Sequence, residues 1–188
     1  MQREYDVQVE WRSFLLRPDT PPEGRPFPYP KDRYEEMSRP LKQMAAEVGL
    51  PIVDHEWIPN SRLALEASEF ARGQGKFDAF HHAVFHAYFA EDRNIGDVDV
   101  LRDLARDVGL DDDALAVALN DGRYRAAVDD DYQLAQRIGF SGVPAFIIGN
   151  RGVVGAQPYE VFEYAMQLAG ATRRDGTSPA SASAPSAE

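Results

Sequence analysis

Residues 140–154 read FSGVPAFIIGNRGVV, and this stretch decides the class of fold. The apolar run from Val143 to Ile148 is short and rich in β-branched and aromatic residues, which is typical of a buried strand. Gly-Asn-Arg-Gly at 149–152 then predicts a tight turn into Val153 and Val154. The stretch therefore predicts a β-hairpin. Immediately after it, Pro158 is expected at the first position of a last helix.

Upstream of the hairpin, residues 32–138 carry helical periodicity almost throughout. Pro40 is expected to kink the first helix or to mark its real beginning. The expected helices run over 32–48, from an Asn60-Ser61 cap to Gly73, over 77–89, from an Asp97 or Asp99 cap to Gly109, around 115–119 and over 124–138. A helical insertion within an α/β domain fits this order better than a strictly alternating sheet.

The N-terminal part of the chain has the period of two that a strand requires. Between residues 5 and 16, Val7, Val9 and Trp11 alternate with polar side chains, so one strand is expected, with Trp11 in the core. Six prolines between Pro18 and Pro30 then predict an irregular loop without regular structure.

Composition excludes several classes of function. The formal charge of -11 disfavours nucleic acid and anionic membrane surfaces as partners. The 188 residues include no cysteine, so the chain holds no disulfide and no thiol nucleophile. Without an apolar leader or a span of about 20 apolar residues, a cytoplasmic location is expected. One domain is predicted over residues 1–170, followed by a disordered tail over 171–188.

Several segments together resemble the DsbA-like thioredoxin-fold family, and the FrnE-type subgroup in particular. The resemblance covers about residues 7–169 and is carried by GVPAFII at 142–148, VEWRSFLL at 9–16, FHAYFAE at 85–91, VGLD at 108–111 and GAQP at 155–158. It implies an α/β fold, a thioredoxin-like sheet with a large helical insertion. Hydroxychromene carboxylate isomerases and kappa-class glutathione transferases are related families.

The family resemblance also implies that the N-terminal strand and helix of the family are missing. Family members begin with a strand and a Cys-x-x-Cys helix, and the chain shows neither, so we expect the N-terminal βα unit to be absent. The resulting gap in the sheet would leave unpaired backbone groups, so we expect an N-terminally incomplete chain or gene model, and two alternatives are open. The strands at 5–16 and 145–148 pair directly, or a partner supplies the strand between them.

By the same resemblance, the Val143-Pro144 bond is expected to be cis and to present the Val143 backbone to an extended peptide or to glutathione. Asn60 resembles the residue with which the glutathione-dependent relatives approach their thiol, although a helix N-cap is the more common role for such a residue. Val143, Pro144 and Asn60 are thus the substrate-binding candidates. No catalytic residue is assigned, and neither Ser13 nor Ser61 is predicted to be a nucleophile.

Other polar residues have structural interpretations. His82 and His86 have the spacing of two metal ligands on a helix but lack a third, so no metal site is predicted. His81 is expected to be partly buried and hydrogen-bonded. The Asp run at 111–113 is expected to cap a helix, and the run at 129–131 to form a solvated face.

The leading hypothesis is a DsbA-family thiol-disulfide oxidoreductase that is inactive in this chain because its redox cysteines are absent. One alternative is a glutathione-dependent isomerase or transferase of the same superfamily; the other is a non-catalytic peptide-binding module. The expected partner is a protein dithiol, a protein disulfide or a glutathione-type thiol. No resident cofactor is expected, glutathione is a candidate co-substrate, and a homodimer is left open.

Overall fold

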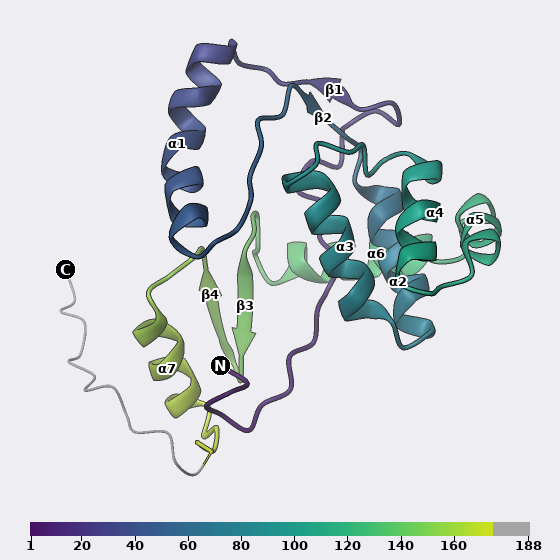
Figure 1. Ribbon diagram of the computed structural model, residues 1–188. Helices are drawn as coiled ribbons and strands as arrows, with labels where there is room; N and C mark the ends of the chain where they lie inside the picture. The colour runs from purple at the N-terminus through teal and green to yellow at the C-terminus, as the bar shows by residue number, and fades with distance from the viewer. Residues whose placement is uncertain (175–188) are drawn as a thin grey trace. The chain divides into compact units, whose positions relative to one another are not determined.

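The computed structural model describes residues 1–174, in which helices predominate and the strands are short (Figure 1). The chain divides into two compact units: residues 13–134 form one, and residues 1–12 join the residues from 135 onward in the other. The predicted mixed α/β class is confirmed. Across residues 1–174, none of the helices combines the length and the apolar character that crossing a bilayer requires.

The first unit is built around a four-helix core. Its helices are α2 (Arg62–Gly73), α3 (Phe77–Phe89), α4 (Val98–Asp107) and α5 (Asp112–Asn120), close to the predicted positions. Asp97 caps α4 and Asp111 caps α5, each by accepting a hydrogen bond from a backbone N–H of the first turn. The large side chains buried in this core include Phe70, Phe80, Leu101, Leu104 and Leu115.

A longer helix and a small strand pair precede this core. The helix α1 (Lys31–Glu47) runs through Pro40 as one element, so the proline does not mark its start. The Pro-rich loop contains β1 (Arg25–Pro26), which pairs antiparallel with β2 (Trp57–Ile58). The expectation of no regular structure between residues 18 and 30 was therefore wrong. Gly24 permits the pairing, because a Cβ there would lie 2.3 Å from Trp57 Nε1.

The helix α6 (Arg125–Arg137) carries the second Asp run, which was expected to be a solvated face. None of its three residues is buried, and the Asp129 side chain is 41% exposed, but two of them also make contacts that the sequence did not predict. Asp129 accepts a hydrogen bond from Arg62 at 2.8 Å, and Asp131 accepts one from the backbone N–H of Ser13 at 2.8 Å. These contacts tie α6 to α2 and to the chain that enters the first unit.

The second unit contains the predicted hairpin, β3 (Ala145–Ile148) and β4 (Arg151–Val154), followed by α7 (Tyr159–Leu168). Gly149 has φ +60° at the first position of the two-residue turn, which suits the twist of a hairpin. Pro158 is the N-cap of α7 and precedes its first helical residue. Phe162 of α7 packs edge-on against Phe146 of β3, with ring centroids 4.9 Å apart.

The N-terminal strand predicted over residues 5–16 does not form. Tyr5 makes one isolated antiparallel bridge with Arg173, and residues 6–16 have no strand geometry. Alternation alone does not make a strand, because its backbone groups need a neighbouring strand, and residues 1–174 supply none beside this segment. Direct pairing with β3 is thus excluded for the described chain. Trp11, expected in the core, is 47% exposed.

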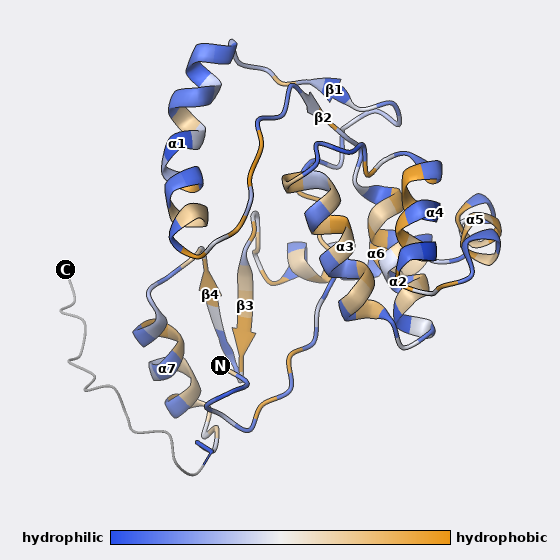
Figure 2. Ribbon diagram, in the orientation of Figure 1, coloured by the Kyte–Doolittle hydropathy of each residue, from blue (hydrophilic) through white to orange (hydrophobic). Residues whose placement is uncertain are grey.

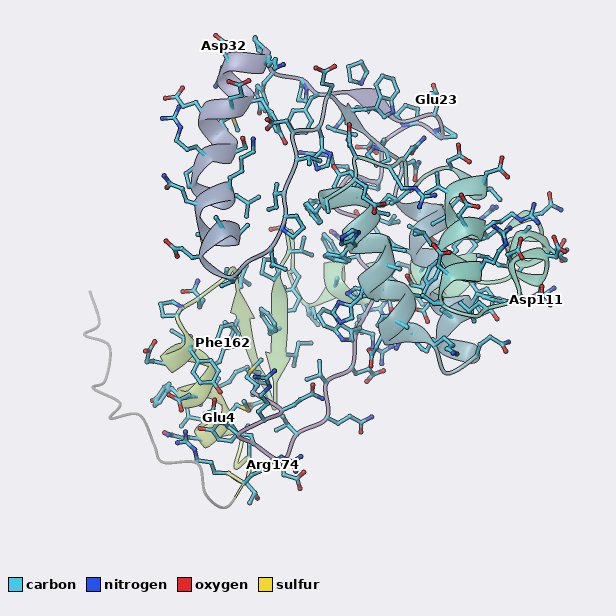
Figure 3. The ribbon with its side chains drawn as sticks, in the orientation of Figure 1. Glu4, Glu23, Asp32, Asp111, Phe162 and Arg174 are labelled. Carbon is cyan, nitrogen blue, oxygen red and sulfur yellow. The ribbon has the colours of Figure 1, made fainter. Side chains whose placement is uncertain are left out.

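The predicted disordered tail began at residue 171, which is too early. Arg173 pairs with Glu4 at 3.1 Å and with the buried Glu163 of α7 at 3.2 Å. The backbone N–H of Arg174 donates to the Glu4 carbonyl at 2.8 Å, and Figure 3 labels both residues where the two segments meet. The remainder of that prediction, residues 175–188, lies outside the described residues.

Candidate functional site

The strand β3 is the candidate site, because one of its two edges carries no strand. It pairs antiparallel with β4 in the register Ala145 with Val154 to Ile148 with Arg151. Within residues 1–174 this two-stranded sheet has no third member. A strand edge of this kind presents unpaired N–H and C=O groups on which an extended chain can be added.

The backbone just before β3 combines a cis peptide bond with a residue that makes no backbone hydrogen bond among residues 1–174. The Val143-Pro144 peptide bond is cis. The Pro144 carbonyl accepts a hydrogen bond from the backbone N–H of Gly155 at 2.8 Å, which fixes this end of the hairpin. Among residues 1–174, neither the N–H nor the C=O of Val143 takes part in a backbone hydrogen bond. The Val143 residue is 55% exposed, so it lies at the surface of its unit, where a partner can approach.

The two faces of β3 differ in what covers them. Phe146 and Ile148 point toward α7 and pack against a small core formed by Val153, Phe162 and Ala165. Because side chains alternate along a strand, Ile147 points away from that core, and it is largely exposed, as are Val143 and Val154. Figure 2 shows β3 in the hydrophobic colour over most of its length. The open edge is therefore bordered by exposed apolar side chains.

A polar network holds α7 and the N-terminal segment behind the hairpin. Arg173 stands between the carboxylates of Glu4 and Glu163, and its guanidinium lies 5.3 Å from the centroid of the Tyr5 ring. Burial, together with a hydrogen bond to Glu4, raises the pKa of Tyr159 to about 12. The phenol therefore stays neutral at physiological pH. This network stabilises α7 and the N-terminal segment, and no catalytic role is assigned to its side chains.

The third substrate-binding candidate, Asn60, lies in the first unit and has a structural role. Its side-chain oxygen accepts from the backbone N–H of Arg62 at 2.9 Å, at the start of α2. Its amide nitrogen donates to the Thr20 carbonyl at 2.6 Å. Asn60, the residue before the N-cap Ser61, thus pairs the backbone N–H of the first residue of α2 and binds the Pro-rich loop. A contact with a thiol ligand stays a prediction.

The histidines of α3 do not assemble a metal site within the part of the chain that is described. No group of three His, Cys, Asp or Glu side chains suited to a metal ion occurs in residues 1–174. His86 instead pairs with Glu91 at 3.2 Å. His81 is partly buried and stacks on Phe77, and burial lowers its pKa.

Two buried polar residues were missed by the sequence analysis. Glu66 of α2 is fully buried, and neither of its carboxylate oxygens has a hydrogen-bond partner among the described residues. His55 is nearly as buried and contacts Asp92, 37 residues away. No local pattern marks either residue, since Glu66 looks like any polar position on a helix and the His55 contact is made only by the fold.

Comparisons with known proteins agree with this architecture. The model of the DSBA-like thioredoxin domain matches residues 1–167. The uncharacterized protein YwbO of Bacillus subtilis (strain 168) is 36% identical over 168 residues, which is 86% of this chain and 82% of that protein. Its identity alone places the two chains in one family.

Solved structures are also similar to this chain. The "probable DsbA oxidoreductase SCO1869" of Streptomyces coelicolor superposes with a TM-score of 0.80 at 26% identity, covering 94% of this chain and 79% of that one. A 2-hydroxychromene-2-carboxylate isomerase shares the fold, with a TM-score of 0.62 at 21% identity and coverage of 75% and 71%. With a family model spanning nearly all of the described residues, the chain belongs to the DSBA-like thioredoxin domain family.

Proposed function

We propose that this chain binds extended thiol- or disulfide-bearing substrates along the open edge of β3, at Val143 and Pro144, and that alone it does not catalyse thiol-disulfide exchange. The observation that carries the proposal is the unpaired backbone of the exposed Val143 beside a two-stranded sheet. Protein dithiols, protein disulfides and glutathione-type thiols are the substrate class expected for the family.

Binding at this edge is strand addition. An extended peptide would accept a hydrogen bond from the Val143 N–H and donate one to the Val143 C=O, and each such bond contributes about 1 kcal/mol net. The exposed apolar side chains of Val143 and Ile147 lie along this edge and offer contacts to alternate side chains of the peptide. Backbone pairing supplies most of the affinity, so the sequence preference is expected to be broad.

The absence of catalysis follows from the chemistry of exchange. A thiolate must attack one sulfur of the substrate disulfide, which forms a mixed disulfide and releases the other sulfur as the leaving thiolate. No residue of the 188 is a cysteine, so the chain supplies no attacking thiolate and cannot carry a mixed disulfide. Its contribution is limited to docking the substrate.

The binding experiment is an NMR titration of the labelled chain with a short peptide that contains a disulfide-bonded cysteine. We expect the amide signals of residues 143–148 to shift saturably. Val143→Pro removes the backbone donor and should abolish the shifts, whereas the matched Val143→Ala keeps that donor and should retain them. Shifts that are equal in both variants, or that are absent from β3 in the unmodified chain, refute edge docking.

Catalysis is tested by insulin reduction with dithiothreitol as the reductant. With the unmodified chain present, insulin is expected to precipitate no faster than with dithiothreitol in buffer alone. Turnover clearly above buffer would show a reaction that needs no thiol from this chain, and the second half of the proposal would fall while edge docking could still stand.

Glutathione is the alternative ligand of the same proposal at the β3 edge, and Asn60 is a separate candidate contact for it in the first unit. The Asn60 amide is already engaged, so a ligand would have to share or displace the bond to the Thr20 carbonyl. Titration with oxidised and reduced glutathione tests each candidate by itself: saturable shifts at Val143 favour glutathione at the β3 edge, and saturable shifts at Asn60 favour a contact in the first unit. The absence of saturable shifts at both residues refutes glutathione as the ligand. Membership of the FrnE-type subgroup and a cytoplasmic location stay predictions of the sequence.

A further inference from the structure

The first unit contains a hollow of about 490 Å³ that is separate from the hairpin and has no part in the proposed docking. Its wall combines aromatic rings with acidic side chains. The lining residues are Phe27, Tyr29, Lys31, Tyr34, Asp54, His55, Glu56 and Asp92. A hollow of this volume suits a small organic ligand or one long side chain.

His55 is held rigidly in this wall. Its ring lies flat on Tyr88, with centroids 4.3 Å apart and planes within 4°, and it is 5% exposed. Nδ1 lies 2.7 Å from an Asp92 carboxylate oxygen. Asp92 has φ +52°, a left-handed conformation that aspartate adopts more readily than most other non-glycine residues.

The same imidazole leaves one atom unsatisfied. Within residues 1–174, Nε2 of His55 is buried without a hydrogen-bond partner. When Nδ1 carries the proton and donates it to Asp92, Nε2 carries a lone pair that can only accept. Leaving a buried acceptor without a donor is unfavourable, so this wall of the hollow contains an unsatisfied polar atom.

The rings of the hollow favour a positive charge. Phe27 contacts Tyr34 at 4.4 Å and Tyr29 at 6.4 Å between ring centroids, which makes a continuous aromatic group. Ring faces attract cations through their negative quadrupole. The chain already uses this group in that way, because the Arg33 guanidinium lies 5.2 Å from the centroid of Tyr29.

The charges around the hollow include both signs. Three carboxylates, those of Asp54, Glu56 and Asp92, face one ammonium group, that of Lys31. Asp54 is paired with Lys42, which stands outside the lining. Glu56 and Asp92 remain against Lys31 and the Arg33 guanidinium on Tyr29, so the local charges are close to balanced. The preference for a cation therefore rests on the rings, on the exposed carboxylate of Glu56 and on the net charge of -11 over the whole chain.

We propose that this hollow binds an organic cation that carries N–H donors, a primary alkylammonium or a guanidinium group. The aromatic group and Glu56 hold the charge, and Asp92 accepts from it. His55 is a positioning residue that keeps the Asp92 carboxylate at the wall. A free amine and the side chain of a peptide lysine or arginine share this chemistry.

The test is an NMR titration of the full labelled chain at constant ionic strength with butylammonium chloride, followed through residues 54–56 and the His55 ring nitrogens. Its neutral counterpart, n-butanol, has the same length without the charge. We expect the shifts for butylammonium to saturate, with a dissociation constant below roughly 50 mM, which is the range for a ligand of so few atoms. The shifts for butanol are expected to be weaker. Acetyl-Gly-Lys-Gly-amide, run in parallel, reports whether a peptide side chain is the better source.

Three variants localise the site. Glu56→Gln and Tyr34→Leu should each weaken butylammonium binding by about threefold or more, and Glu47→Gln, an exposed acid of α1 outside the lining, should leave it unchanged. Glu56 is exposed, so its variant is expected to fold even if Tyr34→Leu does not. Equal binding of butanol, the absence of saturation, or an unchanged affinity in Glu56→Gln would overturn the proposal. None of these outcomes bears on β3.

Discussion

Replacing Glu66 with glutamine is expected to stabilise the first unit at neutral pH. Glu66 is 0% exposed, and its nearest charge partner is the Nε of Arg125 at 3.7 Å. Arg125 itself is largely exposed, so water weakens its attraction for the carboxylate. Burial is the main cause that raises the pKa of Glu66 above its ordinary value, and the attraction of Arg125 offsets only part of that effect.

The sign of the effect follows from the raised pKa. In the unfolded chain the carboxyl ionises near pH 4.5, but in the folded chain it ionises at a higher pH. Between those two pH values the unfolded state binds fewer protons than the folded state, so the free energy of unfolding falls as pH rises. Each pKa unit corresponds to about 1.4 kcal/mol. In the Glu66→Gln variant, residue 66 carries no charge at any pH. Its free energy of unfolding therefore lacks this contribution to the decrease with rising pH.

The expected magnitude is modest. Ionising a buried carboxylate costs several kcal/mol, and an ion pair at 3.7 Å returns about 4 kcal/mol at an effective dielectric constant of 20. After allowance for the exposed partner, we expect the variant to be about 1 kcal/mol more stable than the unmodified chain at pH 7. The difference should shrink toward pH 4, where Glu66 is protonated in the folded state.

Urea denaturation followed by far-UV circular dichroism, repeated at intervals from about pH 4 to 8, measures this difference. Glu36→Gln, at an exposed position of α1, is the matched control and should change stability by less than about 0.5 kcal/mol at every pH. A variant that is no more stable at pH 7, or a difference that does not depend on pH, would show that Arg125 fully compensates the buried charge.

Three further substitutions test the fold. Phe80→Ala empties a fully buried position in the four-helix core and should cost about 3 to 5 kcal/mol in urea denaturation; a loss below 1 kcal/mol would mean that the core collapses around the gap. Arg173→Ala leaves Glu163, which is 3% exposed, without its cation and should cost about 2 kcal/mol and speed amide exchange in α7; unchanged exchange would contradict a stabilising role. Asp97→Ala removes the α4 cap and should cost about 1 kcal/mol, seen as faster exchange in the first turn of α4 only, and faster exchange along the whole helix would contradict a local effect.

Most of the helices could be predicted because their signals are local. The caps at Asp97 and Asp111 and the turn at Gly149 depend on residues within one or two turns of themselves, and each lies where the sequence predicted. The strand predicted over residues 5–16 failed for the opposite reason. Its alternation is local, but a strand also needs a neighbour, and the pattern contains no information about one.

The candidate docking edge was partly predictable. Val143 and Pro144 were identified through the resemblance, and the structure adds that β3 has one unpaired edge and that Val143 makes no backbone hydrogen bond among residues 1–174. The hollow in the first unit was not predictable. It joins Phe27, Tyr34, His55 and Asp92, which lie in four separate segments of the sequence.

By itself the sequence determined the helix boundaries, the hairpin and the absence of a thiol, because these depend on residue identity and on contacts within a few positions. Only the tertiary structure decided that Glu66 is buried without a hydrogen bond, that Arg173 joins the two ends of its unit, and that His55 meets Asp92. Burial and long-range pairing are properties of the assembled chain, since a charge or a ring is stabilised by whichever distant segments the packing brings against it.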